Sequence, residues 1–131
     1  MCAGNTINTQ TFYDRLRNAY LGADSNDSKM WRFRLVMEDY MNFLVAPDSP
    51  DKLQFVEAQE IWVERTRNYR LDKEISFVRR ALNNVVHGKR SGTSDADLKI
   101  YFDSCVLIIN LISGEMPDRA TLAAFGKVDE A

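Results

Sequence analysis

One short segment in the middle of the chain carries the residue types needed for chemistry on a phosphodiester. It reads Phe-Val-Arg-Arg-Ala-Leu-Asn-Asn-Val-Val-His-Gly from 77 to 88 and contains the only histidine, His87. An imidazole titrates near neutral pH and can take or give a proton. A guanidinium can hold a phosphoryl group through two parallel hydrogen bonds. The candidate catalytic residues are therefore Arg79, Arg80, Asn83 and His87.

Helical spacing places these four side chains together. At about 100° per residue, they fall within a sector of about 100°, and Val78, Leu82, Val85 and Val86 point to the other side. Asn83 could fix the imidazole tautomer or bind a phosphate oxygen. A structural explanation stays open, because the helix dipole also favours a histidine beside the last carbonyl groups of a helix.

Charge is distributed unevenly along the chain. Between Arg65 and Arg90 there are eight basic residues and two acidic ones, a net charge of +6, whereas the remainder carries −8. The total of −2 argues against a polyanion binder that acts through overall charge, but a local basic surface can still hold a phosphate backbone. The alternative is a solvated helix face. The candidate nucleic-acid-binding residues are Arg65, Arg67, Arg70, Lys73, Lys89 and Arg90.

Other chemistries lack their residues. One histidine and two distant cysteines, Cys2 and Cys105, make no metal-ligand cluster and no Ser-His-Asp arrangement, and no Gly-rich phosphate loop occurs. We expect neither a metal nor a cofactor. The carboxylate pairs Glu38/Asp39 and Glu57/Glu60 are interpreted as surface charges.

Apolar periodicity and helix-end signals predict an all-α protein, an antiparallel bundle of four to five helices. One domain is expected over residues 1–114, with a short helix (117–125) or a tail within 115–131. The expected first helix runs from Thr9 or Gln10 to Leu21, with Gly22 as its stop, and the second from about Lys29 to Val45. The third runs from Pro50 (capped by Ser49) to about Tyr69, the fourth from Asp72 (as cap) until Gly88 ends it, and the fifth from Ser94 (as cap) to Ile112.

The aromatic residues of these helices are assigned to the core, since they lie at helical spacings. They are Phe12, Trp31, Tyr40, Trp62, Tyr101 and Phe102, with Trp62 the strongest candidate for an exception that forms a base-stacking platform instead. The third helix is expected to present Leu53, Val56, Ile61 and Val63 as its apolar positions.

The stretch from 77 to 88, followed by a turn and an apolar helix, resembles the last two helices of HEPN-type domains. These are small helical bundles, generally homodimeric, of bacterial defence, toxin–antitoxin and restriction systems. Catalytic members carry an Arg, four to six residues and then a His, with a polar residue, often Asn, just after the Arg. Here Arg80 and His87 meet the outer limit of that spacing, and Asn83 occupies the usual Asn position. The more common Arg position, directly before the Asn, holds Leu82.

A second branch of HEPN-like domains has an Arg four residues before the Asn and the His four residues after it, which matches Arg79, Asn83 and His87. Its members also carry an Arg-rich apolar helix that ends in acidic and aromatic residues, similar to Arg32 to Phe43, with Glu38 in the expected place. They are often fused to, or found beside, nucleic-acid-processing enzymes.

The resemblance to catalytic members implies metal-independent RNA cleavage. His87 would act as base on the ribose 2′-hydroxyl or as acid on the leaving 5′-oxygen, and Arg79 or Arg80 would stabilise charge on the phosphorus oxygens. A twofold homodimer would supply a second His87, because one histidine cannot readily do both jobs. The resemblance also implies an antitoxin or another defence component as a partner protein.

Three functions remain open at this point: a dimeric HEPN ribonuclease; a non-catalytic HEPN-like module that binds nucleic acid, a nucleotide or a defence partner; and a structural or inhibitory helical protein. The first ten residues lack the basic and apolar regions of a secretory signal. The longest apolar run, Cys105 to Ile109, continues through Asn110 to Ile112 and is far below the roughly 20 residues that span a bilayer. We therefore expect a cytoplasmic protein with no membrane contact.

Overall fold

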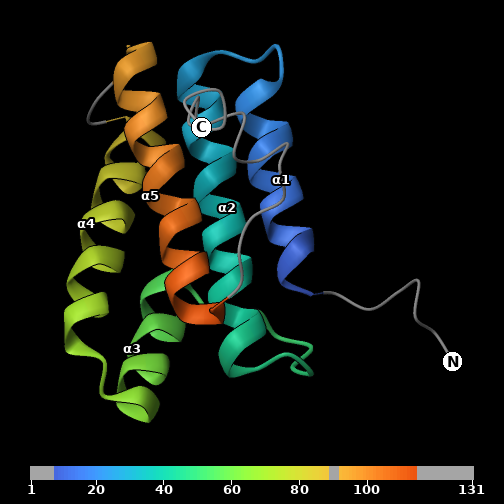
Figure 1. Ribbon diagram of the computed structural model, residues 1–131, viewed down its shortest axis with the longest axis vertical. Coiled ribbons are helices and arrows are strands. Elements are labelled where there is room, and N and C mark those ends of the chain that lie inside the picture. Colours follow the sequence, from blue (N-terminus) through green and yellow to red (C-terminus); the bar gives the residue numbers. More distant parts are fainter. Residues whose placement is uncertain (1–7, 89–91, 115–131) are drawn as a thin grey trace, which may run out of the picture.

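The computed structural model describes residues 8–88 and 92–114, and this part of the chain contains five α-helices and no strand. The helices are α1 (Thr9–Leu21), α2 (Asn26–Val45), α3 (Phe55–Thr66), α4 (Tyr69–Val86) and α5 (Asp95–Ser113) (Figure 1). The all-α prediction is confirmed. Lys89, Arg90 and residues 115–131 lie outside the described residues, as does the short helix or tail expected there.

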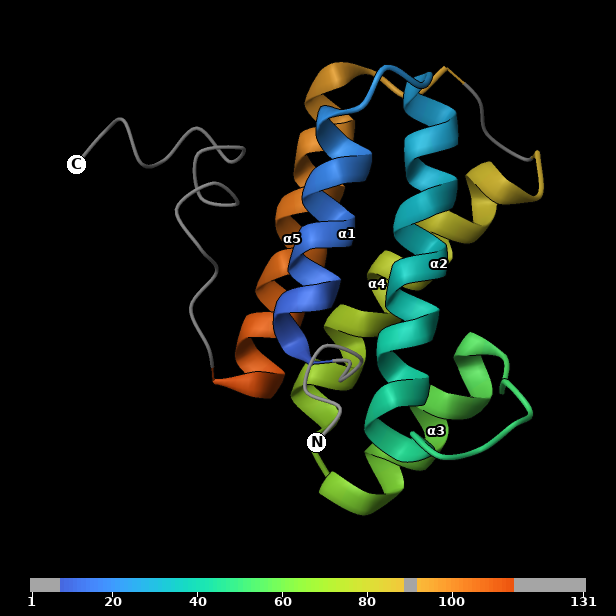
Figure 2. The same cartoon turned by 90° about the vertical axis from the view of Figure 1, so that its right-hand side faces the viewer.

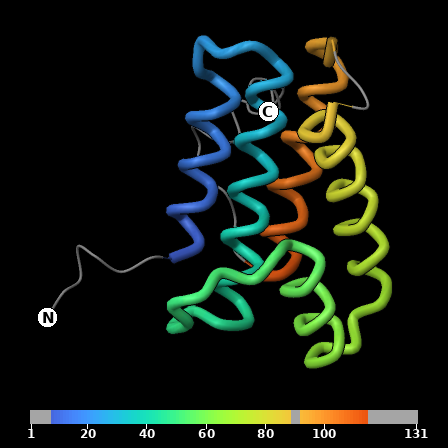
Figure 3. The backbone as a smooth tube through the Cα atoms, turned by 180° about the vertical axis from the view of Figure 1, so that it is seen from behind, coloured from blue at the N-terminus to red at the C-terminus, as the bar shows by residue number. Residues whose placement is uncertain are grey.

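The helix α2 is the centre of the bundle, because it contacts each of the other four helices. α1, α2, α4 and α5 run lengthwise, and the shorter α3 lies near one end against α2 and α4 (Figure 1). α1 and α5 are side by side, as Figure 2 shows. α4 forms one edge of the bundle (Figure 3), so one of its faces packs inward and the other remains open. None of the described helices is both long and apolar enough to cross a bilayer.

Three helix ends predicted from the sequence are confirmed. Gly22 follows α1 as its C-cap, and the Ser94 side chain accepts a hydrogen bond from the Asp97 N–H at the start of α5. α2 likewise ends at Val45. It begins three residues earlier than expected, because the Ser25 side chain caps it by accepting from the Ser28 N–H.

The predicted start of α3 at Pro50 is wrong. α3 begins at Phe55, because a side chain from α2 holds the preceding segment out of the helix. The Asn42 amide binds both backbone groups of Leu53: its Oδ1 accepts from the N–H at 2.9 Å and its Nδ2 donates to the carbonyl at 3.0 Å. Ser49, the expected cap, bonds to Asp51 instead.

The junction between α3 and α4 also differs from the prediction. α3 ends at Thr66, and Arg67 adopts the left-handed conformation with φ of 58°, which reverses the chain. The Asn68 side chain then caps α4 by accepting from the Leu71 N–H at 3.0 Å. Asp72 is therefore not the cap of α4 but a residue of its first turn.

The core contains most of the aromatic residues assigned to it, but the burial of the two tryptophans is the reverse of the prediction. Trp62 is 7% exposed and belongs to the core, whereas Trp31 is 46% exposed. The apolar positions predicted for α3 are confirmed in part: Ile61 and Val63 pack against the core, whereas Val56 is exposed and Leu53, which also packs against the core, precedes the helix. The face that α3 buries consists of Phe55, Ala58, Gln59 and Trp62.

Candidate functional site

α4 holds the residues predicted to do chemistry, and its sequence divides its surface into three parts. The buried part consists of Leu71, Ile75, Val78 and Leu82, which recur at three- and four-residue steps and pack into the core. The polar side chains fall into two groups, one beside this apolar stripe and one roughly opposite it. One group meets α2 and α3, and the other faces solvent.

Arg79 belongs to the group that meets α3. Its Nε donates to Oε1 of Gln59 at 2.9 Å, and Gln59 is only 3% exposed. The Gln59 amide nitrogen donates in turn to Asp72 Oδ1 at 2.6 Å and to Ser76 Oγ at 2.8 Å. Burial lowers the pKa of the Arg79 guanidinium, and the positive charges of Arg80 and Arg34 lower it further. Arg79 is thus part of the contact between α3 and α4.

Asn83 belongs to the same inner group and meets α2. Its Oδ1 accepts from Nε of Arg34 at 2.6 Å, and Arg34 Nη1 lies 3.5 Å from Oε2 of Glu38. That carboxylate also accepts the Phe55 N–H at 3.0 Å and pairs with Lys52 Nζ at 3.0 Å. A negative charge is favourable at this position, because Phe55 opens α3 and the first amides of a helix carry partial positive charge.

The interpretation of Glu38 and Asp39 as surface charges is wrong. Glu38 is 9% exposed and Asp39 is half-buried between two cations. The physical reason is their position on α2, the central helix, where a carboxylate must be paired to be buried. The two carboxylates therefore hold α2 to its neighbours, since Glu38 accepts the first amide of α3 and Asp39 pairs with Arg15 of α1.

The second group on α4 is exposed. Its residues recur at steps of three and four along the helix, and we call them the outer stripe of α4: Arg70, Lys73, Phe77, Arg80, Asn84 and His87. The stripe lies roughly opposite the buried face. Of the acidic residues of α4, Asp72 belongs to the inner group, and the exposed Glu74, four residues after Arg70, borders the stripe near its first turn. Within the described residues, none of its three cations forms an ion pair.

The structure does not bring the four candidate catalytic residues onto one surface of a single chain. Arg80 and His87 lie on the outer stripe, whereas Arg79 and Asn83 bond to α3 and α2. His87 is the C-cap of α4, with its backbone N–H donating to the Asn83 carbonyl at 2.9 Å and its side chain exposed. The imidazole therefore meets solvent at the end of the outer stripe.

The other predicted nucleic-acid-binding residues are also divided. Arg70 and Lys73 lie on the outer stripe. Arg65 donates from Nη1 to the Val45 carbonyl at 2.9 Å, which ties α3 to the end of α2. Arg67 lies at the reversal between α3 and α4, where its Nη1 donates to the Tyr69 hydroxyl at 3.2 Å.

A cavity of about 290 Å³ opens beside the outer stripe, between α4 and α5. Its lining combines cations, aromatic rings and an amide: Lys73, Phe77, Arg80, Ala81, Asn84 and Tyr101. The Phe77 and Tyr101 rings lie 6.2 Å apart between centroids with 33° between their planes. This site is not predictable from the sequence, because it needs Tyr101 of α5 beside Phe77 of α4, and no spacing within one helix reveals that.

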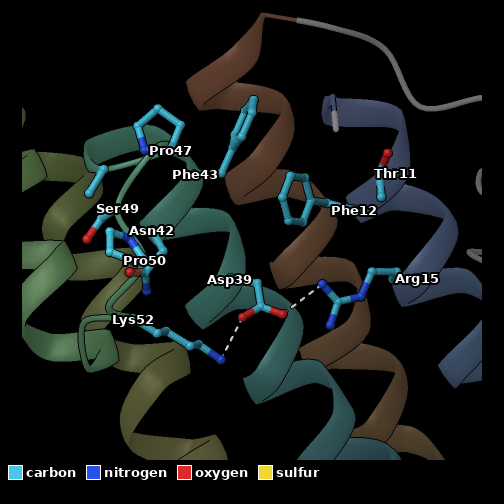
Figure 4. Close-up of a pocket in the computed structure, with 11 residues that line it drawn as sticks. Thr11, Phe12, Arg15, Asp39, Asn42, Phe43, Pro47, Ser49, Pro50 and Lys52 are labelled. Atoms are coloured by element: carbon cyan, nitrogen blue, oxygen red, sulfur yellow. Dashed lines mark ion pairs between the residues drawn. The ribbon is translucent and has the colours of Figure 1, made fainter. Parts of the chain in front are cut away.

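A second cavity of about 270 Å³ lies between α1, α2 and the segment that leads to α3 (Figure 4). Its cations are already neutralised, since Asp39 pairs with Arg15 at 2.8 Å and with Lys52 at 2.6 Å. This cavity is therefore a weaker candidate for an anionic ligand than the one beside the outer stripe. Within residues 8–88 and 92–114, no group of His, Cys, Asp or Glu side chains could hold a metal ion.

Comparison of the chain with family models, with curated proteins and with solved structures gives no match. The geometry of α4 and its neighbours is therefore the basis for assigning a function.

Proposed function

We propose that this protein is a HEPN-like RNA-binding module that holds phosphate groups along the outer stripe of α4. One observation carries the proposal: the stripe presents three cations to solvent, Arg70, Lys73 and Arg80, against one bordering acidic residue, Glu74, in a chain of net charge −2. A local basic surface of this kind attracts a polyanion although the whole chain is acidic.

The length of the stripe suits an extended strand. Arg70 and His87 are seventeen residues apart, which corresponds to about 26 Å of helix. Several successive phosphate groups can contact a surface of that length. RNA is favoured over DNA because His87 stands at one end of the stripe, where an imidazole has a 2′-hydroxyl to bond with in RNA only.

Fluorescence anisotropy with a labelled single-stranded RNA of about twelve nucleotides tests the proposal. The wild-type chain is expected to bind with an affinity that falls steeply as salt rises. The double variant Lys73→Glu/Arg80→Glu should lose most of that affinity, whereas Arg32→Glu, which changes an exposed arginine on α2, should retain it. Wild-type protein that fails to bind, or a double variant that binds as well as wild type, would overturn the proposal.

A second function is favoured by the exposure of His87. An imidazole that is open to solvent at the end of a phosphate-binding surface can act on the RNA held there, which corresponds to a metal-independent ribonuclease of HEPN type. Such an enzyme would work as a homodimer in which two copies of His87 share the acid and base roles. A toxin or another component of a defence system is the biological setting that this activity suits.

A further inference from the structure

We infer that the cavity between α4 and α5 is a nucleobase subsite, and that the protein binds single-stranded RNA in preference to duplex RNA. This inference rests on the proposed function, because it names the kind of RNA that the outer stripe of α4 would take. It adds a recognition element that phosphate contacts alone do not supply, since phosphates are the same in single strands and duplexes.

The walls of the cavity suit a flat, unpaired base. Phe77 is 57% exposed, so one large aromatic side chain points into solvent at the cavity instead of packing in the core. Tyr101 stands beside it at 6.2 Å between ring centroids. Exposed aromatic side chains beside cations are the usual elements of single-strand binding, because every base has a face that stacks on a ring.

Charge around the cavity favours a nucleotide over an uncharged apolar ligand. Lys73 and Arg80 both line it, one turn before and one turn after Phe77 on α4. A base stacked on Phe77 would thus have a cation on each side, where the flanking phosphates of the strand would lie. The Asn84 side chain carries both a donor and an acceptor, which can pair with the edge of an unpaired base.

Duplex RNA cannot use such a site. Its bases are stacked and paired, and its deep major groove excludes side chains, so a duplex offers the protein only its backbone. Other cavities lined in part by α2 fit a base less well. The one in Figure 4 has paired cations, and the one beside Trp31 also contains the Asp27 carboxylate. In the one between α1 and α2, Arg32 is already paired with Asp24.

The test compares three labelled RNA probes of equal length by fluorescence anisotropy: a single strand, the same strand with abasic positions in place of its bases, and a duplex. Wild-type protein should bind the single strand at least about fivefold more tightly than either other probe, which is the lower limit for one stacked base. Phe77→Leu should lose that preference and retain the affinity for the abasic strand. Trp31→Leu, an exposed aromatic residue on α2 outside the cavity, serves as the matched control.

The outcomes separate the inference from the proposed function. Equal binding of all three probes, unaffected by Phe77→Leu, would overturn the base subsite and leave RNA binding by the outer stripe standing. Failure to bind any probe would overturn both. In a third outcome, Phe77→Leu changes the sedimentation coefficient of the protein alone and leaves the preference for the single strand unchanged. This result would show that the aromatic pair contacts a second copy of the chain, and it would also overturn the inference.

Discussion

The guanidinium of Arg34 and the side-chain amide of Asn83 join the middle of α2 to the last turns of α4, with 2.6 Å between Nε and Oδ1. Both side chains are partly buried, and Asn83 supplies the acceptor for a charged donor. Hydrogen bonds to charged groups are among the stronger ones in proteins. In a single chain, Asn83 therefore positions α4 against the central helix.

Replacing Asn83 should reduce stability. Asn83→Ala leaves the Arg34 Nε without its acceptor, and we expect the free energy of unfolding to fall by about 1–3 kcal/mol. Urea denaturation followed by circular dichroism measures the change. Asn84→Ala is the matched control, because Asn84 is exposed and the same substitution should change stability by about 0.5 kcal/mol or less. Equal effects of the two substitutions would contradict this role.

The salt dependence of RNA binding should distinguish the basic residues that contact phosphate from those that hold the fold. Arg80→Ala removes a cation of the outer stripe, so the slope of log affinity against log salt should become shallower by about 0.7. Arg65→Ala should leave the slope unchanged, since Arg65 donates to the Val45 carbonyl. Anisotropy titrations at several salt concentrations provide both slopes, and identical slopes for wild type and Arg80→Ala would exclude Arg80 as a phosphate contact.

The ribonuclease function makes a separate prediction about His87. Wild-type protein incubated with RNA in EDTA should produce fragments that end in cyclic phosphates, because the ribose 2′-hydroxyl is the nucleophile. His87→Ala should abolish these fragments and retain most of the RNA binding. Gel electrophoresis and analysis of the end groups provide the result. Intact RNA with wild-type protein would leave the binding function without catalysis.

Acid should weaken the contact between the start of α2 and the segment before α5. The Asp27 carboxylate accepts hydrogen bonds from the Thr93 hydroxyl at 2.6 Å and from the N–H groups of Thr93 and Gly92 at 3.0 Å each. These hydrogen bonds lower the pKa of Asp27 below its ordinary value of 3.8. The bond from the Thr93 hydroxyl has the largest effect, and the bonds from the N–H groups follow.

A lowered pKa in the folded state means that the unfolded state binds the proton more readily. The stabilisation is therefore fully present above pH of about 4 and is lost as the pH falls through the lower pKa of the folded state. Asp27→Asn should be less stable than wild type at pH 7, and this difference should shrink in acid. Thermal unfolding between neutral pH and pH of about 3 measures it. A difference that stays constant over that range would contradict the prediction.

The helices were largely predictable, because each has a regular apolar face and most of their ends have local signals. Gly22 and Ser94 are signals of this kind, and the structure confirms both. The start of α3 was not predictable, because the decisive contact comes from Asn42, eleven residues before Leu53 in the chain. A Ser-Pro pair is a good local start for a helix, but two hydrogen bonds from another helix override it.

The candidate site was predictable only in part for a related reason. Spacing on α4 places Arg79, Arg80, Asn83 and His87 in one sector, but it does not say which neighbour packs against each edge of that sector. The inner edge of α4 carries a polar stripe of its own at three- and four-residue steps: Asp72, Ser76, Arg79 and Asn83. This stripe was the available signal that the inner edge has polar partners. The aromatic wall of the cavity required Tyr101 from a different helix.

The shortness of α3 has a consequence for the order in which the bundle opens. Twelve residues are at or below the length at which an isolated helix is stable in water, so α3 depends on its contacts with α2 and α4. Several of those contacts are hydrogen bonds to Gln59 and Glu38, which water can replace once the helix moves. We expect the amide protons of α3 to exchange with deuterium well before those of α2, which packs against four helices. Local unfolding would thus begin at α3 and release Arg79 from Gln59 while the rest of the fold persists.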